Sequence, residues 1–134
     1  MQVMLEFSGK TVVVTGAGGG LGMALVTHFS SRGAKVIACD SHKIEGESIA
    51  ASYAFDLLDA KATADSAGAI IANEGTPDIL INNAGIASRG QSVADTDPAE
   101  MERVVRTHAF GPHYLSKLVL PSMRAQPRGD IIMI

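Results

Sequence analysis

A glycine-rich segment at residues 16–22 restricts the possible folds of this chain more than any other feature. It holds five glycines in seven residues and follows a β-branched run, Thr11–Val14. A segment with helical periodicity then begins at Leu21. Glycine accepts positive φ angles and has no Cβ to keep an anion from the backbone, and a helix N-terminus presents free N–H groups. The order of strand, glycine turn and helix therefore predicts a phosphate-binding turn.

The composition is typical of a folded protein with a substantial core. The chain has 134 residues, of which 46% are hydrophobic and 19% charged. A net charge of −3 without a basic run disfavours nucleic acid as a partner. The single cysteine, Cys39, is typical of a reducing compartment. Because Met1–Phe7 does not resemble a signal peptide and no apolar run is long enough to span a bilayer, we expect a cytoplasmic protein without membrane contact.

Strands and helices are expected to alternate along one domain over residues 1–134. The expected strands cover residues 11–15, 34–39, 53–57, 79–82 and 131–134. The expected helices cover residues 21–32, 59–74 and 97–123, with a weakly helical segment at 43–51. This alternation predicts an α/β fold, a doubly wound parallel sheet with helices on both faces. Ligands of such sheets bind at the carboxyl ends of the strands, where the glycine turn, Asp40, Asp56 and Asn83 fall.

The glycine spacing and one acidic residue indicate which ligand the turn would bind. The segment Thr15–Gly22 reads T-G-x-x-x-G-x-G rather than G-x-G-x-x-G, and its place between strand and helix favours nucleotide binding. Asp40 ends the second strand, where a carboxylate can accept the hydroxyls of a ribose and repel a 2′-phosphate. Two unit charges about 4 Å apart interact by roughly 4 kcal/mol at an effective dielectric constant near 20. The nearest basic candidate for a phosphate is Lys43, and the alternative for Asp40 is a solvated strand end.

A second motif adds a family resemblance. The segment Thr15–Gly22 together with Asn82-Asn83-Ala84-Gly85, about 60 residues later, resembles the short-chain dehydrogenase/reductase family. Asp56-Leu57 resembles the Asp-hydrophobic pair that the family places beside adenine, and Asp78–Ile81 resembles its strand before the second motif. The resemblance implies a Rossmann fold, hydride transfer between NAD(P) and a small alcohol or carbonyl, and homo-oligomers, dimers or tetramers, built on the long helix.

The resemblance also implies where a cofactor would bind. It assigns the phosphates to the glycine turn, the ribose to Asp40, the adenine to Asp56 and Leu57, and the other side of the cofactor to the second motif. The expected cofactor-binding residues are Gly16, Gly18, Gly19, Gly20, Leu21, Gly22, Asp40, Asp56, Leu57, Asn83, Ala84 and Gly85. Because of Asp40 we expect NAD in preference to NADP. Thr15 is expected to tie the turn to neighbouring strands through its hydroxyl, and no histidine spacing indicates a metal site.

Two departures from the family pattern concern catalysis. The family's Asn in the long helix, three residues before a Gly, corresponds here to His108, with the glycine at Gly111. Because Pro112 has no N–H, the His108 carbonyl loses its helical partner, and the same carbonyl of the family Asn resembles a water-binding link in a proton relay. His108 is therefore the catalytic candidate, and the alternative is a histidine without a chemical role. Tyr114 and Lys117 have the wrong spacing and position for the family's Tyr-x-x-x-Lys.

The family's Ser and Tyr-x-x-x-Lys would lie beyond the fifth strand. We therefore expect the chain to be the N-terminal, cofactor-binding part of a longer enzyme, truncated after the fifth strand and inactive by itself. In that form residues 131–134 would be an uncovered apolar edge strand. Two alternatives remain open: a nucleotide-binding module without catalysis, such as a pseudoenzyme subunit, and a relative of nucleotide-sugar epimerases, whose glycine spacing is typically G-x-x-G-x-x-G.

Overall fold

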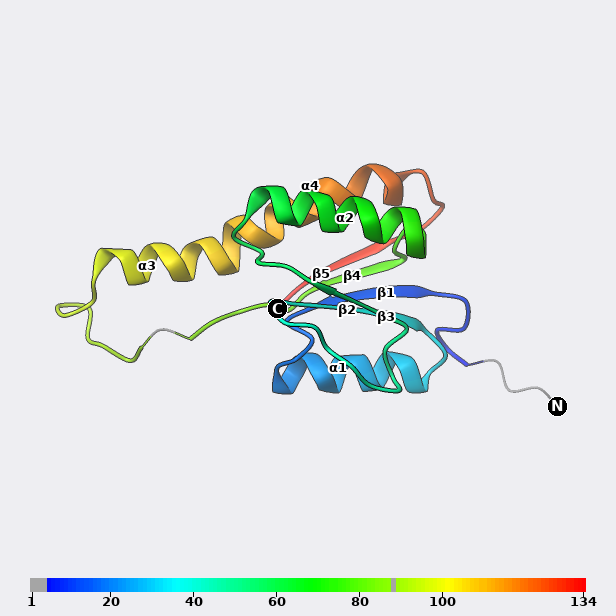
Figure 1. The fold of residues 1–134 in the computed structure, drawn as a ribbon, viewed down its shortest axis with the longest axis horizontal. Coiled ribbons are helices and arrows are strands. Elements are labelled where there is room, and N and C mark those ends of the chain that lie inside the picture. The colour runs from blue at the N-terminus through cyan, green and yellow to red at the C-terminus, as the bar shows by residue number, and fades with distance from the viewer. Residues whose placement is uncertain (1–4, 88) are drawn as a thin grey trace.

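The chain folds as a parallel sheet between two layers of helices (Figure 1). The structure is a computed structural model that describes residues 5–87 and 89–134. The strands are β1 (Thr11–Thr15), β2 (Lys35–Asp40), β3 (Ala51–Ala54), β4 (Ile79–Asn82) and β5 (Asp130–Met133). The helices are α1 (Gly20–Ser31), α2 (Ala60–Glu74), α3 (Pro98–Val105), the π-helix η1 (Arg106–Phe110) and α4 (Gly111–Arg124). The strand order is β3-β2-β1-β4-β5, with α1 on one face and α2 and α4 on the other, which confirms the predicted fold class.

The central strand β1 supplies both hydrophobic layers. Val12 and Val14 pack with Val26 and Phe29 of α1 on one face of the sheet. Val13 points to the opposite face, where it joins apolar side chains of α2 and α4. A strand covered on both faces has no polar alternation, which is why the β-branched run was a reliable signal.

Helix starts and stops follow the local sequence signals. The Asp59 carboxylate accepts the N–H of Ala62 at the start of α2. At the start of α3, Asp97 accepts the N–H of Ala99, with Pro98 as the first helical residue. Gly33, just after α1, has a φ of 92°, the left-handed conformation that glycine adopts readily. The predicted positions of these helix ends are confirmed.

Two predictions between β2 and α2 were wrong. Residues 43–51 form no helix, because the Ile44 N–H donates to the Ser52 hydroxyl and a turn closes at Gly46. The third strand covers Ala51–Ala54 rather than residues 53–57. After one more bond to β2 the chain turns, and the Asp56 carboxylate accepts the Leu58 N–H. Short polar side chains that bind nearby backbone groups compete with regular structure, and the apolar pattern did not show this.

The predicted helix over residues 97–123 is a continuous rod that changes its winding in the middle. Between α3 and α4 the five residues of η1 wind as a π-helix, and the Gly111 N–H donates to the Arg106 carbonyl five residues earlier. Pro112 has no N–H to offer to the carbonyl four or five residues before it, those of His108 and Thr107. A widened turn next to a proline is a common accommodation of this missing donor.

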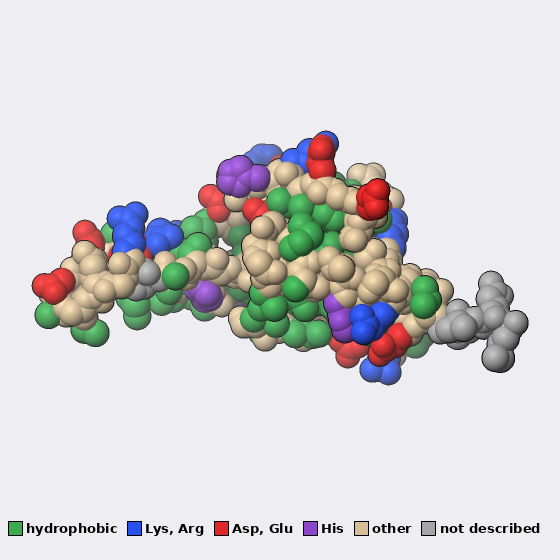
Figure 2. Space-filling view, turned by 90° about the horizontal axis from the view of Figure 1, so that it is seen from below, with side chains coloured by type: hydrophobic (Ala, Val, Ile, Leu, Met, Phe, Trp, Pro, Cys, Tyr) green, Lys and Arg blue, Asp and Glu red, His purple; other side chains and the backbone are tan. Residues whose placement is uncertain are grey.

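β5 forms one edge of the described sheet, shifted by one residue from the predicted 131–134, and its Met133 is exposed. Lys and Arg side chains are interspersed with Asp and Glu on the face seen in Figure 2. Among the described residues, no helix has the length and apolarity required to cross a membrane. Residues 1–4 of the segment in which we expected no signal peptide lie outside the described residues.

Candidate functional site

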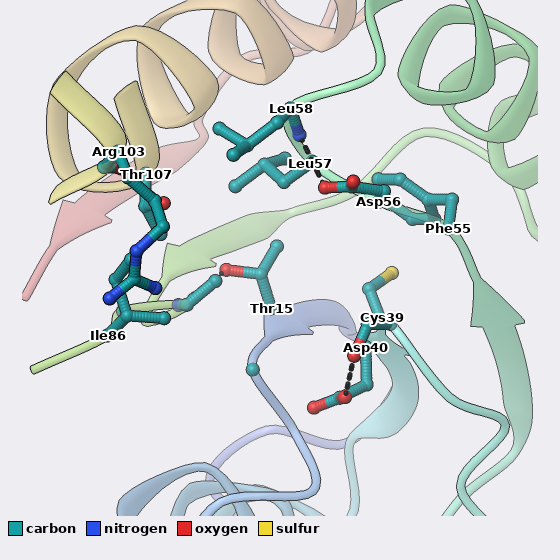
Figure 3. A pocket seen from close by; sticks show the side chains of 14 residues that line it. Thr15, Cys39, Asp40, Phe55, Asp56, Leu57, Leu58, Ile86, Arg103 and Thr107 are labelled. Atoms are coloured by element: carbon teal, nitrogen blue, oxygen red, sulfur yellow. Dashed lines mark hydrogen bonds between the residues drawn. The ribbon is translucent and has the colours of Figure 1, made fainter. Parts of the chain in front are cut away.

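Two adjoining cavities open at the carboxyl ends of β1, β2 and β4. The turn cavity, of about 300 Å³, is lined by Gly16, Gly19, Gly20, Leu21, Gly22, Asp40, Asn83 and Gly85. The side cavity, of about 260 Å³ (Figure 3), is lined by Thr15, Gly16, Cys39, Asp40, Ser41, Phe55, Asp56, Leu57, Leu58, Ala84, Gly85, Ile86, Arg103 and Thr107. Gly16, Asp40 and Gly85 line both. Except for Gly18, which contacts Asp40, every residue expected to bind a cofactor lines at least one of them.

Glycine is required at two positions of the turn and not at a third. Gly16 has a φ of 62°, and a Cβ there would lie 2.8 Å from the Ala84 Cα. A Cβ on Gly22 would lie 1.9 Å from the Gly16 carbonyl oxygen, so α1 can begin directly on the turn only without a side chain there. At Gly20 nothing lies within 4 Å of the added atom. The turn thus brings backbone groups to the cavity surface at close range.

The N-terminus of α1 is uncapped and suited to bind an anion. No side chain caps it, and its first turn holds no acidic residue. The first bond of the helix runs from the Met23 N–H to the carbonyl of Gly19, the residue that precedes α1. The earlier N–H groups of Gly20, Leu21 and Gly22 therefore precede the intrahelical bonds, and the positive end of the helix dipole lies beside the turn cavity.

Asp40 stands between the two cavities and is bound to the turn. Its Oδ2 accepts the Gly18 N–H at 2.9 Å, and its Oδ1 lies 3.3 Å from the Ser41 hydroxyl. The side chain is 18% exposed, so it keeps access to a ligand. Lys43, the nearest basic candidate for a phosphate, instead forms a salt bridge with Glu45 at 3.3 Å.

The side cavity has an acidic rim and an apolar floor. Asp56 accepts the Leu58 N–H at 2.9 Å through Oδ1 (Figure 3). The Cys39 side chain is 1% exposed and points into the cavity. Burial, together with the charge of Asp40, raises the pKa of the Cys39 thiol to about 12. The thiol therefore stays neutral, and Cys39 is a small buried side chain beside the cleft.

Thr15 connects the glycine turn to the second motif, as predicted. Its hydroxyl oxygen accepts the N–H of Asn83 at 3.0 Å and that of Ala84 at 2.9 Å. In return, the Asn83 side-chain amide donates to the carbonyls of Thr15 at 3.1 Å and Gly16 at 3.3 Å. These bonds fix the ends of β1 and β4 to each other beneath both cavities.

Arg103, bound by Glu100, lines a wall of the side cavity that the sequence did not indicate. Arg103 extends from α3 beside Ile86, opposite Asp40 (Figure 3). Two bonds of 3.1 and 2.9 Å join its guanidinium to the Glu100 carboxylate, which also accepts the Arg89 N–H at 3.2 Å. The hydrogen bond and charge of Arg103 hold the Glu100 pKa below its ordinary value of 4.5. The three-residue spacing of Glu100 and Arg103 on a helix was the available signal in the sequence.

Neither the catalytic candidate His108 nor the rejected Tyr114 and Lys117 line the two cavities. His108 lies behind the side-cavity wall, with Nε2 2.8 Å from the Ile86 carbonyl oxygen. Tyr114 lines a separate cavity with Phe110, and Lys117 lines a groove on α4, so neither lines the turn cavity or the side cavity. Within residues 5–87 and 89–134, no group of three or more His, Cys, Asp or Glu could hold a metal ion.

Comparison with known proteins identifies the family to which this fold and site belong. The chain matches the short chain dehydrogenase family over residues 10–134, and it is a member of that family of oxidoreductases. It is 37% identical to the bovine (Bos taurus) dehydrogenase/reductase SDR family member 7B over 139 residues, covering 92% of this chain and 42% of that protein. It is 40% identical to the short chain dehydrogenase/reductase dpmpG of Macrophomina phaseolina over 136 residues, covering 93% of this chain and 78% of that protein.

A solved structure agrees with the fold. A metagenomic short-chain oxidoreductase in complex with NADP superposes with a TM-score of 0.85 at 33% identity, over 93% of this chain and 61% of that one. The chain thus spans 42% of the length of the bovine relative and 61% of the metagenomic enzyme. The chain shares its family with these proteins and its fold with the solved structure, and it corresponds to only part of the length of each.

Proposed function

We propose that this chain is the nucleotide-binding part of an oxidoreductase that transfers hydride between NAD(P) and a small alcohol or carbonyl compound. The observation that carries the proposal is the continuity of the two cavities across Gly16 and Asp40. An anion-attracting turn that leads into a half-apolar side cavity is suited to a ligand with both phosphates and a nucleoside. When bound, the nicotinamide group would supply the hydride acceptor or donor.

The residues present fit such a cofactor. The turn, whose Gly16 and Gly22 leave no room for a Cβ, would hold the phosphates with backbone N–H groups. Asp40 would accept the adenosine ribose hydroxyls. The side cavity would hold the adenine, with Asp56 and Leu57 on one side and Ala84 on the other. The rest of the second motif, Asn83 and Gly85, would adjoin the remaining half of the cofactor.

We propose NAD in preference to NADP. Asp40 puts a negative charge where the 2′-phosphate of NADP would lie, at a cost of roughly 4 kcal/mol for unit charges about 4 Å apart at an effective dielectric constant near 20. The nearest lysine, Lys43, is paired with Glu45. One relative was crystallised with NADP, so the preference depends on this chain's own Asp40 and needs its own test.

The test is a pair of fluorescence titrations, with NADH and with NADPH. We expect the 134-residue chain to bind NADH at least tenfold more tightly, and Asp40→Asn to narrow this ratio because the repelling charge is gone. Glu47→Gln removes an exposed acid that lines neither cavity and is not the salt-bridge partner of Lys43, and it should leave the ratio near the parent value. Equal affinities of the parent chain for both nucleotides would refute the role of Asp40.

The chain by itself is proposed to bind without turning over substrate. A carbonyl reduction needs a general acid near the nicotinamide, and tyrosine serves this role in the family pattern. Of the described tyrosines, Tyr53 donates its hydroxyl to Glu74 and Tyr114 lines another cavity. We therefore expect no NADH oxidation with a panel of small aldehydes and ketones, and sustained oxidation would refute this proposal. The same observation favours a second candidate, a nucleotide-binding module without catalysis.

We further propose that the protein is a cytoplasmic homo-oligomer, a dimer or tetramer, in which residues 1–134 act as one nucleotide-binding domain. The support for the assembly is apolar surface along the rod of α3, η1 and α4, where Met101 is 61% and Phe110 63% exposed. Light scattering after size-exclusion chromatography tests it. A monomer at all concentrations, in the 134-residue chain and any longer form, would contradict it.

A further inference from the structure

A single ring nitrogen of His108 contacts the segment that follows β4. Its Nε2 lies 2.8 Å from the Ile86 carbonyl oxygen and 3.1 Å from the Ile86 amide nitrogen. The ring also fills the space beside Gly85, where a Cβ would come within 2.7 Å of His108 Cε1. Gly85 and Ile86 both line the side cavity. The imidazole is therefore a direct contact between η1 and one wall of that cavity.

One nitrogen cannot make both of these bonds at once. With a proton, Nε2 donates to the Ile86 carbonyl; without one, it accepts from the Ile86 N–H. In the neutral ring the two tautomers exchange one bond for the other, and in the protonated ring only the bond to the carbonyl remains. A carboxamide carries its donor and its acceptor on separate atoms and is not restricted in this way.

We propose that His108 is a positioning residue for the side cavity, one that holds the Gly85–Ile86 segment through whichever bond the proton on Nε2 allows. The holding of the segment is a property of the ligand-free chain. Its consequence for dinucleotide affinity rests on the proposed function, because it assumes that the side cavity binds the adenosine half of the cofactor.

The charged side chains around this contact have partners of their own. Arg103, on the same wall, and Arg106, on η1, are each paired with a glutamate of their own helical rod. Across the cavity, Asp40 and Asp56 each accept a backbone N–H. Carboxylates and guanidinium groups ordinarily titrate outside the range of about pH 5 to 8 in which imidazoles exchange a proton. A response of the Ile86 segment within that range is therefore assigned to His108 if it disappears in His108→Asn and persists in His113→Asn.

Hydrogen exchange of the Ile86 amide, followed by NMR in the ligand-free 134-residue chain, tests the proposal. Expressed as a protection factor, the rate is corrected for the intrinsic effect of pH. Between about pH 8 and about pH 5 we expect Ile86 protection to fall about three- to tenfold, the effect of one net hydrogen bond. His108→Asn, which can bond both groups, should raise the protection and abolish its pH dependence. His113→Asn replaces a histidine on α4 and should leave the response unchanged.

The outcomes separate this proposal from the proposed function. Ile86 protection that does not change with pH in the parent chain, or the same pH response in His108→Asn, overturns the positioning role. If His108→Asn fails to fold, the pH dependence of Ile86 protection in the parent chain decides the positioning role by itself. NADH titrations on the same samples are expected to follow the protection at Ile86. If no sample binds NADH while the exchange behaves as expected, the proposed function fails and the positioning role stands.

Discussion

The two sides of the cavities present different parts of the chain to a ligand. On the side of β1 and α1, the surface is backbone: glycines packed so closely that an added Cβ at Gly22 would lie 1.9 Å from a carbonyl oxygen. On the side of α3 and η1, the surface is held by polar side chains, with Glu100 binding Arg103 and His108 binding Ile86. The first side leaves no room for a side chain at Gly16 and Gly22, whereas the second depends on protonation states.

The largest expected effect is on the backbone side. Gly22→Ala forces a Cβ into the Gly16 carbonyl, so α1 must move off the turn, at about 3 kcal/mol or more in the free energy of unfolding. We expect NADH binding to be lost as well. Urea denaturation and an NADH titration measure the two effects. Gly20→Ala is the matched control, because its Cβ meets nothing within 4 Å, and equal behaviour of the two variants would contradict the packing argument.

A smaller effect is expected where the turn joins the second motif. Thr15→Val keeps the shape of a buried side chain and removes the acceptor of two N–H groups, those of Asn83 and Ala84. We expect a loss of about 2 kcal/mol in the free energy of unfolding, and weaker NADH binding. Thr15→Ser retains the hydroxyl and should lose less than half as much. A Thr15→Val variant as stable as the parent would show that water replaces the hydroxyl.

The smallest effect is expected on the side-chain wall, and it depends on pH. Because Arg103 holds the folded-state pKa of Glu100 below 4.5, this carboxylate stabilises the fold above that value, and the contribution is lost as the pH falls through the lowered pKa. Glu100→Gln should therefore lower the melting temperature by a few degrees at neutral pH. The difference from the parent chain should vanish well below pH 4.5.

A neighbouring ion pair provides the control for this prediction. Glu102 bonds Arg106 at 3.1 Å on the same rod, but both side chains are more than half exposed. Exposed pairs contribute little to stability, so Glu102→Gln should leave the melting temperature nearly unchanged. The comparison fails if the two glutamine variants lose the same amount, or if the effect of Glu100→Gln does not depend on pH.

The contrast between the two sides also explains what the sequence could predict. The sequence predicted the strand at Thr11–Thr15 and the turn that contains Gly16 and Gly22. A buried strand favours β-branched residues, and a tight turn requires glycine at fixed positions, so both leave a local pattern in the sequence. The same holds for the helix starts at Asp59 and Asp97, where a short polar side chain caps the first turn. Each of these signals acts between residues that are near in sequence.

Contacts between segments that are distant in sequence left no such pattern. Nothing at position 103 shows that its guanidinium would face Asp40 across a cavity, because that depends on where α3 projects from the sheet. The contact of His108 with Ile86, 22 residues away, was likewise not foreseen. The third strand was misplaced because the side chain of Asp56, rather than the apolar Phe55 and Leu57 beside it, determines where the chain turns.

The π-helix between α3 and α4 has a consequence for how this rod can vary. One residue of an α-helix corresponds to a rotation of about 100° about the axis, so a one-residue bulge sets the two halves out of phase. The face of α4 is fixed by Leu115 and Val119, which are buried against the sheet, while α3 projects beyond it (Figure 1). The bulge thus sets the rotation of α3 about the rod axis relative to α4. Losing the bulge would therefore turn Arg103 and its partner Glu100 about the axis, and move this wall of the side cavity, without a change at Leu115 or Val119.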